Sequence, residues 1–204
     1  MNCDFIAPHY WWMERLGMGR ALERRRRRFL PEFRDARRAL VLGDGDGRFL
    51  CELLRRCPLV RADYVDLSKG MLELARRKAG SDRVSYRRAD ALTMDFTAGE
   101  YDLIATHFFF DCFGTEELDV LIERVANAAQ PGAQWVVSEF CLSSVPARLL
   151  VSALYLFFRM TTGLKTRTLT DHRPIMQAHG FQLKTASHSR AGIVVSELWE
   201  RGSL

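Results

Sequence analysis

The stretch LVLGDGDGRFL, residues 40–50, places three glycines on alternate positions directly after an apolar run. That run, ALVL at 39–42, has the composition of a buried strand. Gly43, Gly45 and Gly47 each cost conformational entropy on folding, so they need a reason in turn geometry or in the close approach of a ligand. The stretch therefore predicts a strand that ends in a ligand-binding loop.

Strand patterns and helix patterns alternate around this loop. The predicted strands are 39–42, 62–65, 83–88, 101–106, 134–140, 181–188 and 193–199. The predicted helices are one or two within 8–35, then 48–56, 68–79, one capped by Thr115, 146–160 and 171–179. This order predicts an α/β fold, a doubly wound and mostly parallel seven-stranded sheet with a C-terminal antiparallel strand and N-terminal capping helices. Ligands bind such sheets outside the carboxyl ends of the strands, where the glycine loop is expected.

The charge of the chain suggests nucleic acid as a partner, but its distribution does not. The net charge is +5 and the pI is about 9.1. The densest basic run, Arg24 to Arg28, occupies five consecutive positions, so on a helix it points in all directions and forms no stripe. We expect a solvated helix there and no nucleic-acid partner.

The five cysteines predict neither a disulfide framework nor a metal site. Their number is odd, and no CxxC pair occurs among positions 3, 51, 57, 112 and 141. We therefore expect reduced thiols and no bound metal.

The spacing of the glycines excludes two common phosphate-binding loops. A dinucleotide loop needs G-x-G-x-x-G, but the sixth position from Gly43 is Arg48 and from Gly45 is Leu50. A Walker A loop needs a following G-K-[ST], which is absent. The spacing G-x-G-x-G thus argues against an NAD(P)-dependent oxidoreductase of this fold.

Four stretches in this order resemble the class I S-adenosylmethionine-dependent methyltransferases, from about Ala39 to Phe140. They are GDGDG (43–47), YVDLSKGMLELARRK (64–78), RADAL (88–92) and YDLIATHFFFDCF (101–113). The resemblance implies S-adenosyl-L-methionine as cofactor and methyl transfer as the reaction.

The resemblance also implies which residues hold the cofactor. Asp66 matches the acid that bonds both ribose hydroxyls, Asp90 the acid that bonds the adenine amine, and Ala91 its neighbour on the ring. A carboxylate suits this task because it accepts two hydroxyl protons in short, charge-assisted bonds. The full expected set is Gly43, Asp44, Gly45, Asp46, Gly47, Asp66, Leu67, Met71, Asp90, Ala91 and Thr106.

One position departs from the family pattern. Many members carry an acid two residues before the first glycine, near the amino group of the methionine part, and here that position is Val41. Either Asp44 or Asp46 replaces this acid from the loop, or backbone carbonyls hold the amine.

The acceptor side is predicted from the loop after the fourth strand. The sequence ATHFFFD stands where amino-methylating enzymes of nucleobases have N-P-P-[FY], and the C-terminal part is more similar to small-molecule and quinone-type members. The run of phenylalanines at 108–110, with Phe113, suits an apolar or aromatic acceptor. His107 and Asp111 are the candidate catalytic residues, His107 as base or acceptor-positioning group, with a buried structural histidine as the alternative.

These observations predict one domain over 1–204, with a helical cap (1–36), a cofactor-binding half (37–140) and a C-terminal part (141–204). No apolar run is long enough for a membrane span, and the N-terminus lacks a secretory pattern, so we expect a cytoplasmic protein. Its expected partner is a small-molecule acceptor, while weak contact with a membrane surface stays open. The alternatives are an NAD(P)-binding oxidoreductase and a non-catalytic S-adenosylmethionine-binding protein.

Overall fold

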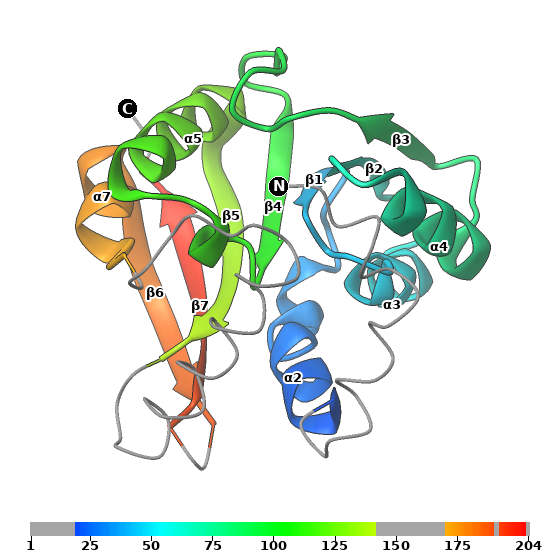
Figure 1. Cartoon of the computed structure of the whole chain (residues 1–204), viewed down its shortest axis with the longest axis horizontal. Coiled ribbons are helices and arrows are strands. Elements are labelled where there is room, and N and C mark those ends of the chain that lie inside the picture. The colour runs from blue at the N-terminus through cyan, green and yellow to red at the C-terminus, as the bar shows by residue number, and fades with distance from the viewer. Residues whose placement is uncertain (1–18, 142–169, 190–191, 203–204) are drawn as a thin grey trace.

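The computed structural model describes residues 19–141, 170–189 and 192–202 (Figure 1). Its strands are β1 (Arg38–Leu42), β2 (Arg61–Asp66), β3 (Val84–Arg88), β4 (Tyr101–His107), β5 (Ala129–Phe140), β6 (Phe181–His188) and β7 (Val194–Arg201). Its helices are α2 (Gly19–Arg26), α3 (Arg48–Arg56), α4 (Lys69–Ala79), α5 (Thr115–Ala128) and α7 (Arg173–Ala178), with short 3-10 helices η3 (Leu30–Phe33) and η4 (Phe110–Cys112).

The seven strands form one sheet in the order β3-β2-β1-β4-β5-β7-β6. Neighbours from β3 to β5 pair in parallel, whereas β7 runs antiparallel to both β5 and β6. The predicted α/β fold, with a mostly parallel seven-stranded sheet and one antiparallel strand near its C-terminal edge, is confirmed.

The N-caps of α4 and α5 can be compared with those that the sequence predicts. The sequence predicts Ser68 as the N-cap of α4, and its Oγ accepts a hydrogen bond from the Met71 amide at 3.2 Å. It predicts Thr115 as the cap of α5, which is wrong by one residue: the N-cap is Gly114. There Glu117 accepts the Gly114 amide proton at 3.1 Å, because an acid in the first turn can satisfy the free amide group.

The start of β5 also differs from the prediction. The sequence predicts a strand from 134, but β5 begins at Ala129 and includes Pro131 and Gly132. The ladder to β4 is irregular there, since pairing shifts between Tyr101 and Leu103 and Gly132 has a φ of 76°. The pairing passes from Ala129 to Gln134 on β5 but only from Tyr101 to Leu103 on β4, so the proline and the left-handed glycine lie in an irregular part of the ladder.

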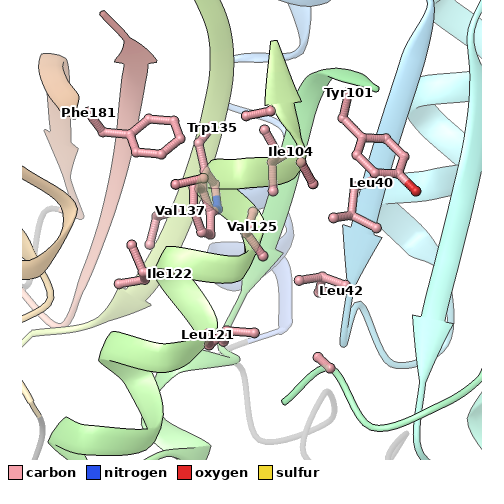
Figure 2. Close-up of a cluster of buried hydrophobic side chains, with 14 of the residues drawn as sticks. Leu40, Leu42, Tyr101, Ile104, Leu121, Ile122, Val125, Trp135, Val137 and Phe181 are labelled. Atoms are coloured by element: carbon pink, nitrogen blue, oxygen red, sulfur yellow. The ribbon is translucent and has the colours of Figure 1, made fainter. Parts of the chain in front are cut away.

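The sheet separates two hydrophobic layers. On one face α3 and α4 cover alternate residues of β1 and β4, among them Val41 and Ala105. On the other face α5 covers Leu40, Leu42 and Ile104, and Figure 2 shows Ile122 and Val125 of this helix beside Trp135 and Val137 of β5. Because strand side chains alternate, odd and even positions of β1 and β4 contact different helices.

The register of the sheet brings several loops to one edge. Leu42, the last residue of β1, pairs with Val65 of β2 and with Thr106 of β4. The glycine loop, the residues after β2 and the loop after β4 therefore leave the sheet side by side. This is the carboxyl edge, where the sequence places the ligand.

Some predictions fall on residues outside the described ranges. These are the helix at 146–160 and most of the N-terminal cap, so the division of the chain into cap, cofactor-binding half and C-terminal part stays a prediction. In the described ranges, no helix combines the length and the apolar character that crossing a membrane requires.

Candidate active site

The glycine loop needs its glycines for conformation and for packing. Gly43, Gly45 and Gly47 have φ values of 63°, 65° and 77°, in the left-handed region that favours glycine. A Cβ on Gly47 would lie 2.8 Å from the Cβ of Ala75 in α4, and one on Gly43 would lie 2.2 Å from Cδ2 of Phe109. Two glycines thus admit close approach of the chain itself, α4 on one side and the loop after β4 on the other.

Asp44 is a buried carboxyl group that the described residues satisfy at only one of its two oxygens. Its Oδ2 accepts a hydrogen bond from the Leu50 amide at 3.2 Å, in the first turn of α3. Its Oδ1 is buried and has no hydrogen-bond partner among the described residues. Burial raises the pKa of Asp44 from 3.8 to about 7, although the positive charge of Arg26 lowers it. A positively charged ligand group beside Oδ1 would satisfy it.

Asp46 has different surroundings from Asp44. Both of its oxygens accept from Arg48 Nε, at 3.1 and 2.9 Å, and Oδ2 also contacts Lys78 Nζ of α4. The carboxylate therefore joins the two helices behind the glycine loop. Val41 is fully buried on the α3 face. Of the two acids considered as replacements at this position, Asp44 is the one with an oxygen that no described residue pairs.

Two of the expected ribose-side residues lie at the open end of β2. Asp66 ends the strand, and its Oδ1 accepts a hydrogen bond from the Ser68 amide at 2.8 Å, in an Asx turn that leads into α4. Leu67 follows with 39% of its surface exposed, whereas Met71 is buried in the first turn of α4. The structure thus places Asp66 and Leu67 at the carboxyl edge.

The expected adenine-side residues follow β3. Asp90 is exposed, and its Oδ1 accepts the Leu92 amide proton at 2.9 Å, while Ala91 is buried. β2 and β3 are neighbours, with Asp66 opposite Arg88 in the register. The two acids that the family resemblance singles out therefore lie at the ends of adjacent strands.

Thr106 does not face the edge. Its side chain is fully buried, and its Oγ1 accepts a hydrogen bond from Trp135 Nε1 at 2.9 Å. As an even-numbered residue of β4 it lies on the face that α5 covers. In this structure the hydroxyl serves the core.

His107 lies on the opposite face of β4 from Thr106. It is 1% exposed, and its ring centroid is 4.5 Å from that of Phe49 in α3. Neither ring nitrogen has a hydrogen-bond partner within the part of the chain that the structure describes. Burial lowers the pKa of His107 well below 6.5, so the ring is neutral. The expected position beside an acceptor at the carboxyl edge is not what the structure shows: the imidazole points into the α3 layer.

The loop after β4 carries the other expected acceptor-side residues. Phe108 has a φ of 55°, a conformation that costs energy for a bulky residue and turns the chain out of β4. Its ring lies 4.9 Å from that of Phe140, and the Phe109 ring lies 5.0 Å from that of Phe113. Phe110 is buried instead, between Trp135 and His172.

Asp111 is partly exposed in this loop, within η4. Its burial raises the pKa from 3.8 to about 7, against a hydrogen bond from the Cys112 thiol. The pKa of this carboxyl group therefore lies near neutral pH. A general base works best with a pKa near the working pH.

Glu139 was not expected from the sequence. Near the end of β5, it is 3% exposed, and its Oε1 accepts the amide protons of Phe109 and Phe110, both at 2.9 Å. Its Oε2 is buried without a hydrogen-bond partner among the described residues. The available signal is the acid in the stretch WVVSEF, where a buried strand would otherwise carry an apolar side chain.

A second buried acid, Glu197 of β7, is fully paired. It accepts from His172 at 2.8 Å and Trp199 Nε1 at 3.0 Å through Oε2, and from Arg173 Nε at 2.8 Å through Oε1. Burial raises the pKa of Glu197, but the bonds and charges of His172 and Arg173 outweigh it and lower the pKa overall. This network fixes α7 to the sheet.

In the described ranges, no group of three His, Cys, Asp or Glu side chains could hold a metal ion.

Comparisons with known proteins agree with this geometry. The family described as Methyltransferase domain matches residues 39–132. The demethylmenaquinone methyltransferase of Thermus thermophilus is 32% identical over 139 residues, 66% of this chain and 62% of that protein. Its counterpart from Deinococcus radiodurans is 31% identical over 160 residues, 76% of this chain and 64% of that protein. The chain thus spans less than two thirds of the length of these relatives.

A solved structure shows the same fold. The N-methyltransferase NodS from Bradyrhizobium japonicum superposes with a TM-score of 0.68 at 15% identity, over 92% of this chain and 98% of that one. The sheet order, the glycine loop and the match over residues 39–132 are those of the class I S-adenosylmethionine-dependent methyltransferases. The cofactor that the class implies is S-adenosylmethionine.

Proposed function

We propose that the chain transfers a methyl group from S-adenosylmethionine to a small apolar or aromatic acceptor, with a demethylated quinol ring as the first candidate. The two relatives named demethylmenaquinone methyltransferases support this acceptor class. The phenylalanine-rich loop after β4 supports it as well, because aromatic side chains pack well against a planar ring.

The observation that carries the proposal is Asp44 in the glycine loop. A buried carboxyl group with one unsatisfied oxygen is costly unless something pairs with it. The ammonium group of the methionine part of the cofactor has the charge and the hydrogen-bond donors that Oδ1 lacks. The residues present therefore fit the cofactor, and Asp44 takes the role of the acid that Val41 cannot supply.

The rest of the cofactor would be held by the ends of β2 and β3. Asp66 would accept the two ribose hydroxyl protons, with Leu67 and Met71 beside the ring. Asp90 would accept from the adenine amine, and Ala91 would lie against the adenine. These roles follow the family resemblance, and the adjacent positions of Asp66 and Asp90 at the carboxyl edge support them.

The cofactor supplies a methyl group on a positively charged sulfur, so the chain has to align the acceptor, exclude water and take up a proton. Phe109 lies against Gly43 and would exclude water from the methionine side of the site. Alignment of two bound reactants alone accounts for about 7–11 kcal/mol of barrier in favourable cases. Asp111, partly exposed in the same loop, is the proposed proton acceptor.

Two residues of the expected site receive other roles in this proposal. His107 packs on Phe49 as a neutral ring, and Thr106 satisfies the indole of Trp135. Both side chains lie in the layers behind the site. The predicted cytoplasmic location and the absence of a nucleic-acid partner stay predictions.

The test is a methyl-transfer assay with labelled S-adenosylmethionine and three acceptors: a demethylated naphthoquinol, a catechol and a primary amine. We expect label in the naphthoquinol or the catechol and none in the amine. Label in the amine alone would overturn the acceptor class. Binding of S-adenosylmethionine with no turnover of any acceptor would favour a non-catalytic binding protein.

A further inference from the structure

A pair of carboxyl groups lies where the loop after β4 meets the end of β5. Glu139 of β5 holds the Phe109 and Phe110 amides through Oε1, and Asp111 is the next residue of that loop. Burial raises the pKa of Glu139 well above 4.5, and the negative charge of Asp111 raises it further. They therefore titrate as a pair.

Glu139 has more than a structural task. The two hydrogen bonds from backbone amides use only its Oε1. Its Oε2 has no hydrogen-bond partner in the described ranges, although the residue is only 3% exposed. A carboxylate that only fixed a loop would not need a second, unsatisfied oxygen in the core. Oε2 of Glu139 is therefore the atom that can carry a proton.

The charge that β7 presents to the pair is negative, so it does not offset the negative charge of the two acids. Glu197 is the charged group that faces Glu139 from this strand, and its negative charge raises the pKa of Glu139 further. Glu197 is itself bound to His172 and to the guanidinium group of Arg173. From η4, the Cys112 thiol faces Asp111 at 3.6 Å.

The pair also lies close to the expected position of the reaction. Phe109, whose amide Glu139 holds, contacts Gly43 of the glycine loop. Asp111 is two residues further along the same loop and partly exposed, whereas Glu139 is enclosed. Asp111 can therefore contact an acceptor, and Glu139 acts behind it.

We propose that Asp111 and Glu139 act as one carboxyl site that accepts the proton released by the methyl acceptor, with Asp111 as catalytic residue and Glu139 as the residue that positions it. The inference rests on the proposed function and narrows the acceptor to a ring with an ionisable hydroxyl group or an acidic ring carbon. The acceptor's electron pair forms the bond to the methyl carbon, the sulfur–carbon bond breaks with its electrons left on sulfur, and the acceptor's proton passes to Asp111.

A titration of the whole chain tests the pair without any acceptor. Carboxyl-carbon NMR follows Asp111 and Glu139 from pH 4 to 9 in the wild type and in Glu139→Gln, whose amide oxygen can still accept both backbone protons. We expect Glu139 to keep its proton at the pH where Asp111 titrates, and Asp111 to titrate in a single step in the variant. Ionisation of both groups below pH 5 would overturn the proposal.

Kinetics with the acceptor found by the transfer assay give the second readout. We expect Asp111→Asn to lower kcat at least 100-fold and Glu139→Gln at least tenfold, with KM and S-adenosylhomocysteine affinity within twofold of the wild type. The matched control is Asp102→Asn, since Asp102 also accepts two consecutive amide protons, from Arg37 at 2.7 Å and Arg38 at 3.0 Å, at the other end of β4. It should leave kcat unchanged.

Wild-type kcat and an unshifted pH profile in both site variants would refute the carboxyl site. Failure of the wild type to bind S-adenosylhomocysteine would instead overturn the proposed function. The NMR titration distinguishes the two failures, because it reports the proton of the pair in either case.

Discussion

The ring of Phe109 occupies the space that a side chain on Gly43 would need. A Cβ there would come within 2.2 Å of Phe109 Cδ2, closer than van der Waals contact allows. Glycine is thus required at position 43, after β1, because of Phe109, which follows the neighbouring strand β4. The cofactor side and the acceptor side of the site are joined at this contact.

Gly43→Ala should destabilise the fold more than a comparable change elsewhere. Alanine in the left-handed region costs about 1–2 kcal/mol, and here the clash with Phe109 is added. Gly99→Ala is the matched control, since Gly99 has a φ of 61° and no atom within 4 Å of the added Cβ. Urea unfolding should show a larger loss for Gly43→Ala, and part of the difference should be recovered in Gly43→Ala/Phe109→Ala. Equal losses for the two glycines would contradict the contact.

Asp44 should make stability fall as the pH rises. Its pKa is about 7 when folded against an ordinary 3.8, so the folded chain holds a proton that the unfolded chain has released. The free energy of unfolding should therefore decrease between pH 4 and 7, by up to about 4 kcal/mol from this group. Asp44→Asn should remove this part of the decrease, and urea unfolding at pH 4.5 and 7.5 measures it. The same slope as in the wild type, or an equal effect of the exposed control Asp82→Asn, would speak against a buried proton on Asp44.

His107→Phe should leave methyl transfer intact. The imidazole is neutral, packed at a tilt against the ring of Phe49 and without hydrogen-bond partners in the described part, so an apolar ring of similar shape suits the site. We expect kcat within twofold of the wild type and equal or higher thermal stability. A tenfold lower kcat with unchanged cofactor affinity would restore His107 as the base. Thr106→Val, by contrast, should destabilise the protein by about 1–3 kcal/mol, because it leaves the Trp135 indole proton unsatisfied in the core.

Much of the fold follows from local patterns in the sequence. The glycine loop after ALVL, Ser68 at the start of α4 and the order of strands and helices suffice to predict the sheet and its carboxyl edge. The position of β7 between β5 and β6 needs the tertiary structure, because two consecutive strand patterns do not show which of the two strands joins the rest of the sheet.

The site was less predictable than the fold. A sequence places His107 and Thr106 at the end of a strand, but the face to which each side chain points depends on strand phase, and here neither points to the edge. Glu139 lies 28 positions beyond Asp111, so only the pairing of β4 with β5 brings the two acids together. Asp44 could be suspected from the missing acid at Val41, yet its unsatisfied oxygen is visible only in three dimensions.

Calorimetric titration with S-adenosylhomocysteine tests the central claim most directly. The wild type should bind one molecule per chain and should not bind NADPH. Asp66→Ala should bind at least tenfold more weakly, since each charged hydrogen bond lost costs about 1.5–3 kcal/mol. Asp82→Ala, an exposed acid outside the site, should bind like the wild type. Binding of NADPH in place of S-adenosylhomocysteine, or unchanged affinity in Asp66→Ala, would contradict the account.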